Sequence, residues 1–139
     1  MTAAERLAAL TGRWHVARVV RHDDGDTARF EGTADWMPQG PVLRCTEAGR
    51  LTQAGTTFAA TRETLWRADA ARILVAFADG APFHDFEALD RTAATHDCPP
   101  DLYRLFYDFG AWPRWSVRWD VTGPRKAYRA LTRYRRPRG

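Results

Sequence analysis

The segment THDCPPDLY, residues 95–103, gathers several side chains with chemical potential into one short stretch. His96 could transfer a proton or bind a metal, Cys98 could act as a nucleophile or ligand, and Asp101 could act as an acid or base. On a strand, His96 and Cys98 point to the same face, because side-chain direction alternates with a period of two. The two prolines that follow lack N–H groups and predict the end of that strand. The simplest interpretation is a turn in which Asp101 accepts backbone hydrogen bonds.

A second histidine, His84 in PFHDF, lies on an expected neighbouring strand. His84, His96 and Cys98 could converge at one mouth of the fold, with Asp101 nearby. Such donors suit zinc, but they lie on different elements without a recognised spacing, so we predict no metal and no cofactor. The same histidines could instead do acid–base chemistry with Tyr103 or Asp101. No nucleophile elbow or phosphate-binding loop accompanies them, so a small enzyme is the alternative hypothesis.

Arginines on otherwise apolar strand faces form another set of candidates. Arg18 shares a face with Trp14, and Arg62 shares one with Trp66. An arginine that points into a protein needs an anionic partner, either an acid of the protein or a ligand. Alternatively, these long side chains lie at a rim and extend to water.

Lys126 is the single lysine among 21 basic residues. It shares an expected strand face with Tyr128, and an ammonium beside a phenol could hold the acidic group of a ligand. Trp66 and Trp119 lie on apolar faces and could line a pocket, although aromatic residues on strands more often only pack.

The elements that must position these residues are nearly all strands. Thr2 and Glu5 form a capping box that predicts a short N-terminal helix, and Gly12 ends it. The remaining chain alternates apolar and polar residues between short turn signals. The expected strands are GRWHVARVVRH, TARFEGTADWMP, VLRCTEAG, TTFAATRETLWRAD, RILVAFADG, PFHDFEAL, TAATHDC, DLYRLFYDFG, RWSVRWDVTG and RKAYRALTRYRR. They predict one domain, residues 1–139, an all-β closed antiparallel meander barrel of eight to ten strands.

Composition narrows the possible partners. The formal net charge is +4, but basic residues alternate with acids except in the tail RYRRPRG, so we expect no nucleic acid as a partner. Two cysteines without a CxxC motif indicate neither a disulfide framework nor a structural zinc site. No apolar run approaches the ~18 residues of a membrane span, so we expect a cytoplasmic protein without a membrane partner.

The start of the first strand, LTGRWHV, resembles that of the calycin superfamily, which includes the lipocalins. In those families a Gly-x-Trp follows a short helix, here Gly12 and Trp14. An arginine of the last strand packs over the tryptophan, and Arg133 or Arg135 would match it. Nitrobindin-like haem barrels are also calycins, but they use a late histidine, and the last histidine here is His96. The resemblance therefore implies a lipocalin-like barrel without haem.

The whole chain also resembles DUF6314, a bacterial family of unknown function. The segments that carry the resemblance are LxGxW, FADGAPFHDF, HDCPPDLY, GPRKAY and YRR. It implies the same lipocalin-like barrel and no established activity.

The leading functional hypothesis is a barrel that binds a partly apolar, anionic small molecule. The expected ligand-binding residues are Lys126, Tyr128, His84, His96, Tyr103, Arg18, Arg62, Trp66 and Trp119. A structural barrel filled by its tryptophans is the third hypothesis. The oligomeric state and any catalytic residue are left open.

Overall fold

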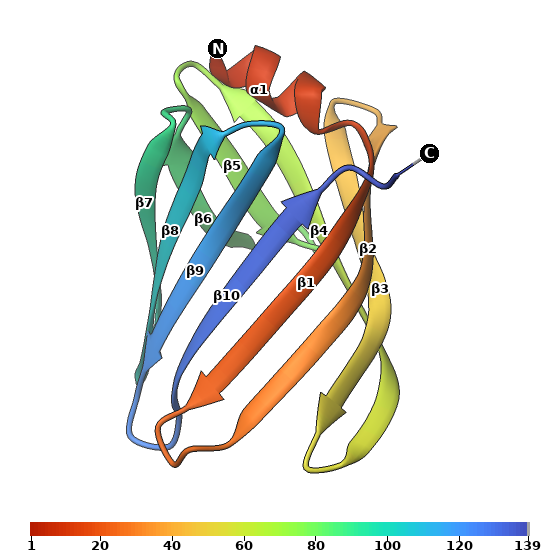
Figure 1. The fold of residues 1–139 in the computed structure, drawn as a ribbon. Helices are drawn as coiled ribbons and strands as arrows, with labels where there is room; N and C mark the ends of the chain where they lie inside the picture. Colours follow the sequence, from red (N-terminus) through yellow and green to blue (C-terminus); the bar gives the residue numbers. More distant parts are fainter. Residues whose placement is uncertain (139) are drawn as a thin grey trace.

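The computed structural model, which describes residues 1–138, is a ten-stranded antiparallel sheet curled into a nearly closed barrel (Figure 1). One helix, α1 (Ala3–Leu10), precedes the sheet. The strands are β1 (Gly12–His22), β2 (Thr27–Gln39), β3 (Val42–Gln53), β4 (Thr56–Asp69), β5 (Arg72–Phe77), β6 (Pro82–Glu87), β7 (Arg91–Cys98), β8 (Asp101–Ala111), β9 (Arg114–Thr122) and β10 (Ala127–Arg135). The fold class predicted from the alternation is confirmed.

The sheet order is β6-β5-β4-β3-β2-β1-β10-β9-β8-β7, so each strand pairs with its neighbours in the chain except at β6 and β7, which form the two edges. The first and last strands also pair, from His15 opposite Arg135 to His22 opposite Tyr128. The two edge strands, β6 and β7, contact each other without a hydrogen-bonded ladder. Side chains therefore complete the wall at this seam, and Phe86 of β6 stacks on Tyr107 of β8 with ring centroids 4.0 Å apart.

Helix α1 covers one end of the barrel, the upper end in Figure 1. The predicted capping box is present: Glu5 N donates to Thr2 Oγ1 at 3.1 Å, and Thr2 N donates to Glu5 Oε1 at 2.9 Å. Leu10 is fully buried, and the Arg6 guanidinium lies over the Phe109 ring, 4.3 Å from its centroid. The helix therefore closes the upper end with both apolar and cation–π contacts. No helix within residues 1–138 is long and apolar enough to cross a membrane.

An arginine does pack over Trp14, but it is neither Arg133 nor Arg135. Both of these lie on the outer face of β10, since they alternate with the buried Tyr134. Arg136, the first residue after the strand, folds back so that its guanidinium lies 3.9 Å from the Trp14 ring. It donates to the carbonyl oxygens of Ala9, Thr11 and Arg13. Because Arg136 follows the end of β10, its side chain is not subject to the strand alternation that places Arg133 and Arg135 on the outer face.

The barrel interior has two different halves. Toward α1, aromatic rings pack closely: Trp14, Trp36, Trp66, Phe86, Tyr107, Phe109, Trp115 and Tyr134 are all at most 6% exposed. Trp115 and Tyr134 stack with centroids 3.9 Å apart. Cys45 lies in this upper half, where burial raises the pKa of its thiol to about 12. The hypothesis of a structural, tryptophan-filled barrel describes this half.

The half remote from α1, which we call the open half, has an interrupted wall. β5 pairs only with Thr64–Asp69 of β4, so residues 56–63 of β4 have no strand partner on that side. Inward-facing apolar side chains are consequently exposed, with Phe58 at 46% and Phe77 at 37%. Solvent therefore reaches the inside of the barrel at this end.

Candidate functional site

The segment THDCPPDLY is a hairpin. β7 ends at Cys98, Pro99 and Pro100 form the turn, and β8 begins at Asp101. The turn was expected. The Asp101 carboxylate was expected to accept hydrogen bonds from backbone N–H groups, but its Oδ2 instead lies 3.4 Å from the Lys126 ammonium.

The possible convergence of His84, His96, Cys98 and Asp101 does not form a metal site. Within residues 1–138, no group of three or more His, Cys, Asp and Glu side chains has metal-binding geometry. Cys98 is exposed at the end of β7, and the Phe83 ring separates the two histidines.

His84 is buried and pairs with a tyrosine that the sequence analysis did not select. Its Nε2 lies 2.7 Å from the Tyr107 hydroxyl, while Nδ1 has no partner within residues 1–138. Burial, assisted by His96, lowers the pKa of His84 from 6.5 to about 3. His84 is therefore neutral at physiological pH, and its hydrogen-bond partner is Tyr107 instead of Tyr103 or Asp101. The enzyme hypothesis also named His96, whose ring centroid lies 5.6 Å from that of Tyr103.

This neutral histidine makes stability depend on pH. Between pH 6.5 and about pH 3 the unfolded chain takes up a proton that folded His84 does not, so stability falls as the pH is lowered. We expect His84 to account for a loss of roughly 3 kcal/mol between pH 7 and pH 4. His84→Gln keeps a polar group for Tyr107 but cannot titrate. Urea unfolding from pH 7 to pH 4 should therefore show a flatter profile for the variant, and parallel profiles would contradict this assignment.

Arg18 and Glu47 form an ion pair inside the barrel at the boundary between its two halves. Nη1 and Nη2 of Arg18 donate to Oε1 and Oε2 of Glu47 at 2.6 and 3.0 Å, and Nε donates to Thr132 Oγ1 at 2.8 Å. The side chains are 16% and 4% exposed. Burial opposes ionisation of Glu47, but the charges of Arg62 and Arg18 outweigh it, so the pKa of the carboxyl is lowered. Arg18 thus points inward as expected, and its partner is an acid of the protein.

Arg62 approaches the same carboxylate from the side of the open half. Its Nη2 lies 3.6 Å from Glu47 Oε2, and its side chain remains 40% exposed. The guanidinium also lies over Trp119 at 5.0 Å from the ring centroid. Two arginines therefore share one carboxylate, and the second of them is accessible to solvent.

Five rings line the open half beside Arg62, and we call them the lower aromatic cluster. They are Phe77, Phe83, His96, Tyr103 and Trp119, contributed by five successive strands from β5 to β9. Phe83 is central, with ring centroids 4.7 Å from Phe77, 5.1 Å from His96 and 5.4 Å from Trp119. The cluster lies where the two edge strands meet, and it brings together three of the expected site residues.

Lys126 lies at the rim of the open half and not inside it. It precedes β10, and its Nζ donates to the Tyr103 hydroxyl at 2.9 Å while pairing with Asp101. The hydrogen bond to Tyr103 and the nearby Asp101 raise the pKa of the ammonium. Tyr128 is half-buried near His22, with centroids 5.6 Å apart. The charge of Lys126 therefore already has a protein partner.

Comparison with protein families gives one match. The sequence matches the DUF6314 family, a family of unknown function, over residues 10–136. The chain belongs to this family. Comparison of the DUF6314 chain with curated proteins finds no match.

Comparison with solved structures gives one neighbour that shares the fold of this DUF6314 barrel and one weaker match. The S-type phycobiliprotein lyase CPES from Guillardia theta superposes with a TM-score of 0.73 at 6% identity, covering 100% of this chain and 94% of the lyase. A fluorescence-activating β-barrel designed de novo gives a TM-score of 0.43 at 16% identity, covering 99% of this chain and 100% of the design. At 6% identity, the likeness to the lyase shows a common barrel fold.

The DUF6314 barrel brings some of the expected residues together and separates others. Arg18, Arg62, Trp119, His96 and Tyr103 face the same interior region. Trp66 belongs to the packed upper half, where its Nε1 donates to Thr64 Oγ1 at 2.8 Å. Sequence reasoning missed Glu47, although it shares a strand face with the buried residues Leu43 and Cys45, and an acid in such a pattern signals an inward charge.

Proposed function

We propose that the barrel binds a small, partly apolar, anionic molecule in its open half, between Arg62 and the lower aromatic cluster. The observation that carries this proposal is the unequal charge of the interior. Arg18 and Arg62 supply two positive charges and Glu47 supplies one negative charge, so one positive charge is unmatched. Arg62 carries the accessible share of this charge, because Arg18 is held by both oxygens of Glu47.

The walls around Arg62 favour a ligand with an apolar part. Exposed inward-facing rings such as Phe58 and Phe77 gain free energy by burial, roughly 25 cal/mol per Å² of apolar surface. Trp119 already lies under the Arg62 guanidinium and offers a flat surface for an aromatic or conjugated group. His96 and Tyr103 add hydrogen-bonding groups to the same wall.

The packed upper half limits how deeply a ligand can enter. A cavity between Arg62, His84 and Trp66 has a volume of only about 20 Å³, enough for one water molecule. A water there could satisfy His84 Nδ1. The ligand therefore occupies the open half, and the upper half acts as its rigid floor.

The proposal is compatible with the fold, which the chain shares with a phycobiliprotein lyase at a TM-score of 0.73. The enzyme alternative has less support for His84, since this histidine is neutral and its hydrogen-bond partner is Tyr107.

Two fluorescent probes that differ in one anionic group test the proposal. 8-Anilinonaphthalene-1-sulfonate carries a sulfonate, and N-phenyl-1-naphthylamine is the same ring system without it. We expect the sulfonate probe to bind more tightly, and Arg62→Gln to weaken its binding about tenfold or more while changing binding of the neutral probe little. Native mass spectrometry of the purified protein would show in parallel whether a small molecule is retained.

Arg50→Gln is the matched control. Like Arg62→Gln it removes one positive charge, but Arg50 lies on β3 at an exposed, outward-facing position. It should leave both affinities within about twofold, as expected of a distant surface charge screened by salt. Equal losses in the two variants, or equal affinity for the two probes, would contradict the proposal.

A further inference from the structure

We propose that a groove on the outer face of β1, β9 and β10 binds a small phosphorylated compound through Arg114, Arg133 and Arg135. The groove has a volume of about 490 Å³ and is separate from the barrel interior, since these arginines alternate with buried residues and face outward. Its size lies within the ~300–1,000 Å³ of typical small-molecule sites.

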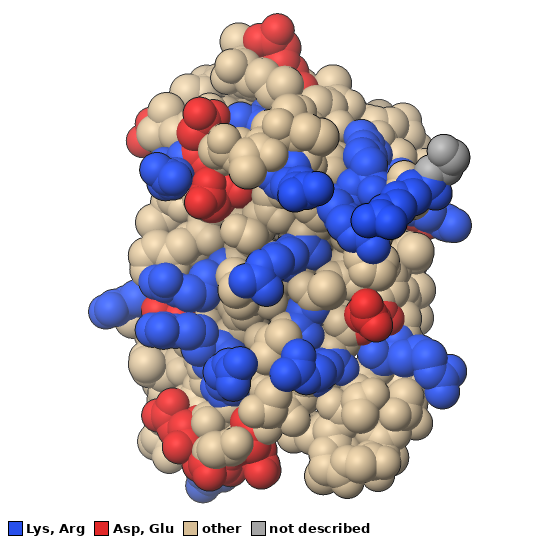
Figure 2. Space-filling model, viewed as in Figure 1, with Lys and Arg blue, Asp and Glu red and all other residues tan. Residues whose placement is uncertain are grey.

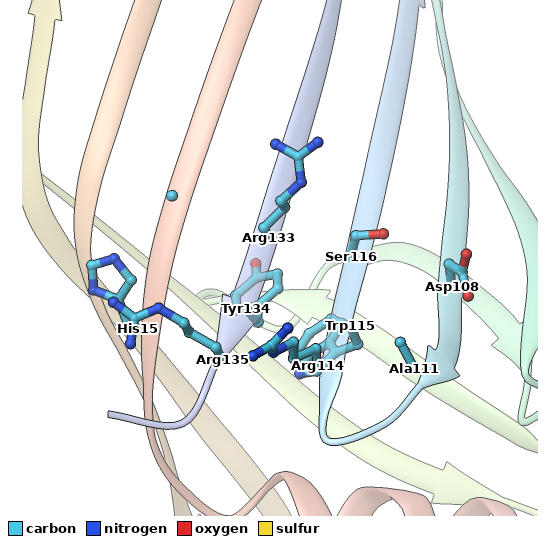
Figure 3. Close-up of a pocket in the computed structure, with 10 residues that line it drawn as sticks. His15, Asp108, Ala111, Arg114, Trp115, Ser116, Arg133, Tyr134 and Arg135 are labelled. Carbon is cyan, nitrogen blue, oxygen red and sulfur yellow. The ribbon is translucent and has the colours of Figure 1, made fainter. Parts of the chain in front are cut away.

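The cross-strand register explains why a hollow forms here. Arg133 lies between Ala17 of β1 and Ser116 of β9, both of which carry short side chains. Long side chains flank these short ones along the strands. In Figure 3, Arg114 extends from β9 toward Arg135, Arg135 extends toward His15, and Arg133 points along β10 away from the other two. Basic groups therefore border the hollow on both sides.

The charge of the groove is uncompensated. Within residues 1–138, none of the three arginines has a carboxylate within ion-pair distance. Trp115 pairs with Tyr134, so Arg114 and Arg135 flank this pair on adjacent strands, where like charges repel. An anion held between them would relieve this repulsion.

Two other arginines on the same face share an acid of the protein. Arg118 and Arg129 both pair with Asp120, at 3.3 and 2.9 Å. Asp108, the acid that lines the groove, accepts from Gly110 N at 2.8 Å and pairs with Arg91 at 3.5 Å. Figure 2 shows basic side chains gathering over β8, β9, β10 and β1.

A phosphate monoester fits this groove by charge and geometry. Arginine forks bind phosphate oxygens in pairs, and a phosphate carries close to two negative charges at neutral pH. The Ser116 hydroxyl adds a donor, while each Asp108 oxygen keeps a second lone pair that can accept from a hydroxyl group of a sugar. The ligand class is therefore a small hydroxylated phosphate ester.

Isothermal titration with ribose 5-phosphate and ribose, at low ionic strength, tests the assignment. Ribose 5-phosphate should bind and ribose should not. Arg133→Gln and Arg135→Gln should each weaken binding about tenfold or more, whereas Arg67→Gln, an exposed arginine on β4, should change it by less than about twofold. Thermal unfolding would confirm that all variants fold.

Arg62→Gln separates this groove from the interior site, because it should leave ribose 5-phosphate binding unchanged whether or not the interior binds a ligand. Equal weakening by Arg67→Gln and Arg133→Gln would overturn the proposal, as would binding of ribose itself. Tight binding of an oligothymidylate without measurable binding of ribose 5-phosphate would also overturn it in favour of a nucleic-acid surface.

Discussion

Glu47→Gln is expected to lower the free energy of unfolding by about 3–5 kcal/mol, since it leaves Arg18 buried without its counter-charge. This corresponds to a decrease in Tm on the order of 10 °C. Arg18→Met should have an effect of similar size because it leaves Glu47 without its two-oxygen partner. Urea unfolding followed by tryptophan fluorescence measures both values.

The double variant Arg18→Met/Glu47→Leu distinguishes an unpaired charge from simple loss of packing. Replacing both partners by apolar groups removes the buried charges together, so we expect stability within about 2 kcal/mol of the wild type. Additive losses would instead show that the two side chains stabilise the protein independently, through packing and other contacts and not through each other.

Arg62→Met provides the comparison within the same cluster. Its side chain is 40% exposed and lies 3.6 Å from Glu47, so its loss should cost no more than about 1 kcal/mol. The two arginines thus have different roles: Arg18 neutralises Glu47 inside the protein, and Arg62 is available to a ligand. A loss for Arg62→Met as large as that for Arg18→Met would contradict this division.

Gly32→Ala is expected to destabilise the barrel by about 2–4 kcal/mol. Gly32 of β2 lies directly opposite Gly49 of β3, and the two strands approach closely at this point. A Cβ atom on Gly32 would lie 2.1 Å from the Ala48 carbonyl oxygen and 2.6 Å from Gly49 Cα. Both neighbours are backbone atoms, so the sheet itself would have to move.

Thr33→Ala tests whether this effect is specific to the close approach. It changes the next residue of the same strand on the opposite face, and we expect a change within about 0.5 kcal/mol. Thermal unfolding of both variants measures the difference. Similar Tm values for Gly32→Ala and the wild type would contradict this prediction and show that the two strands separate easily.

Much of the fold could be predicted from alternation alone. Successive side chains of a strand point to opposite faces, so the inward positions of Arg18, Arg62 and Trp119 follow from their spacing to buried tryptophans. The capping box of α1 depends on two residues three apart and was likewise readable. These features are local, and neighbouring residues determine them.

The pairings between distant strands could not be read in this way. Glu47 reaches Arg18 across β2, and Asp101 at the start of β8 pairs with Lys126 in the turn between β9 and β10. His84 meets Tyr107 only because the edge strands come together when the barrel closes. The register and curvature of the sheet decide which side chains meet, and neither is visible in a single strand.

The same distinction applies to charge. The sequence showed arginines alternating with acids, and only the tail resembled a cluster. In the folded protein, antiparallel pairing places Arg114, Arg133 and Arg135 around one groove while the nearby acids pair elsewhere. The sequence thus determined the fold class and the alternation of side chains along each strand. Only the tertiary structure decided which charges are matched, because matching depends on distances between strands far apart in the chain.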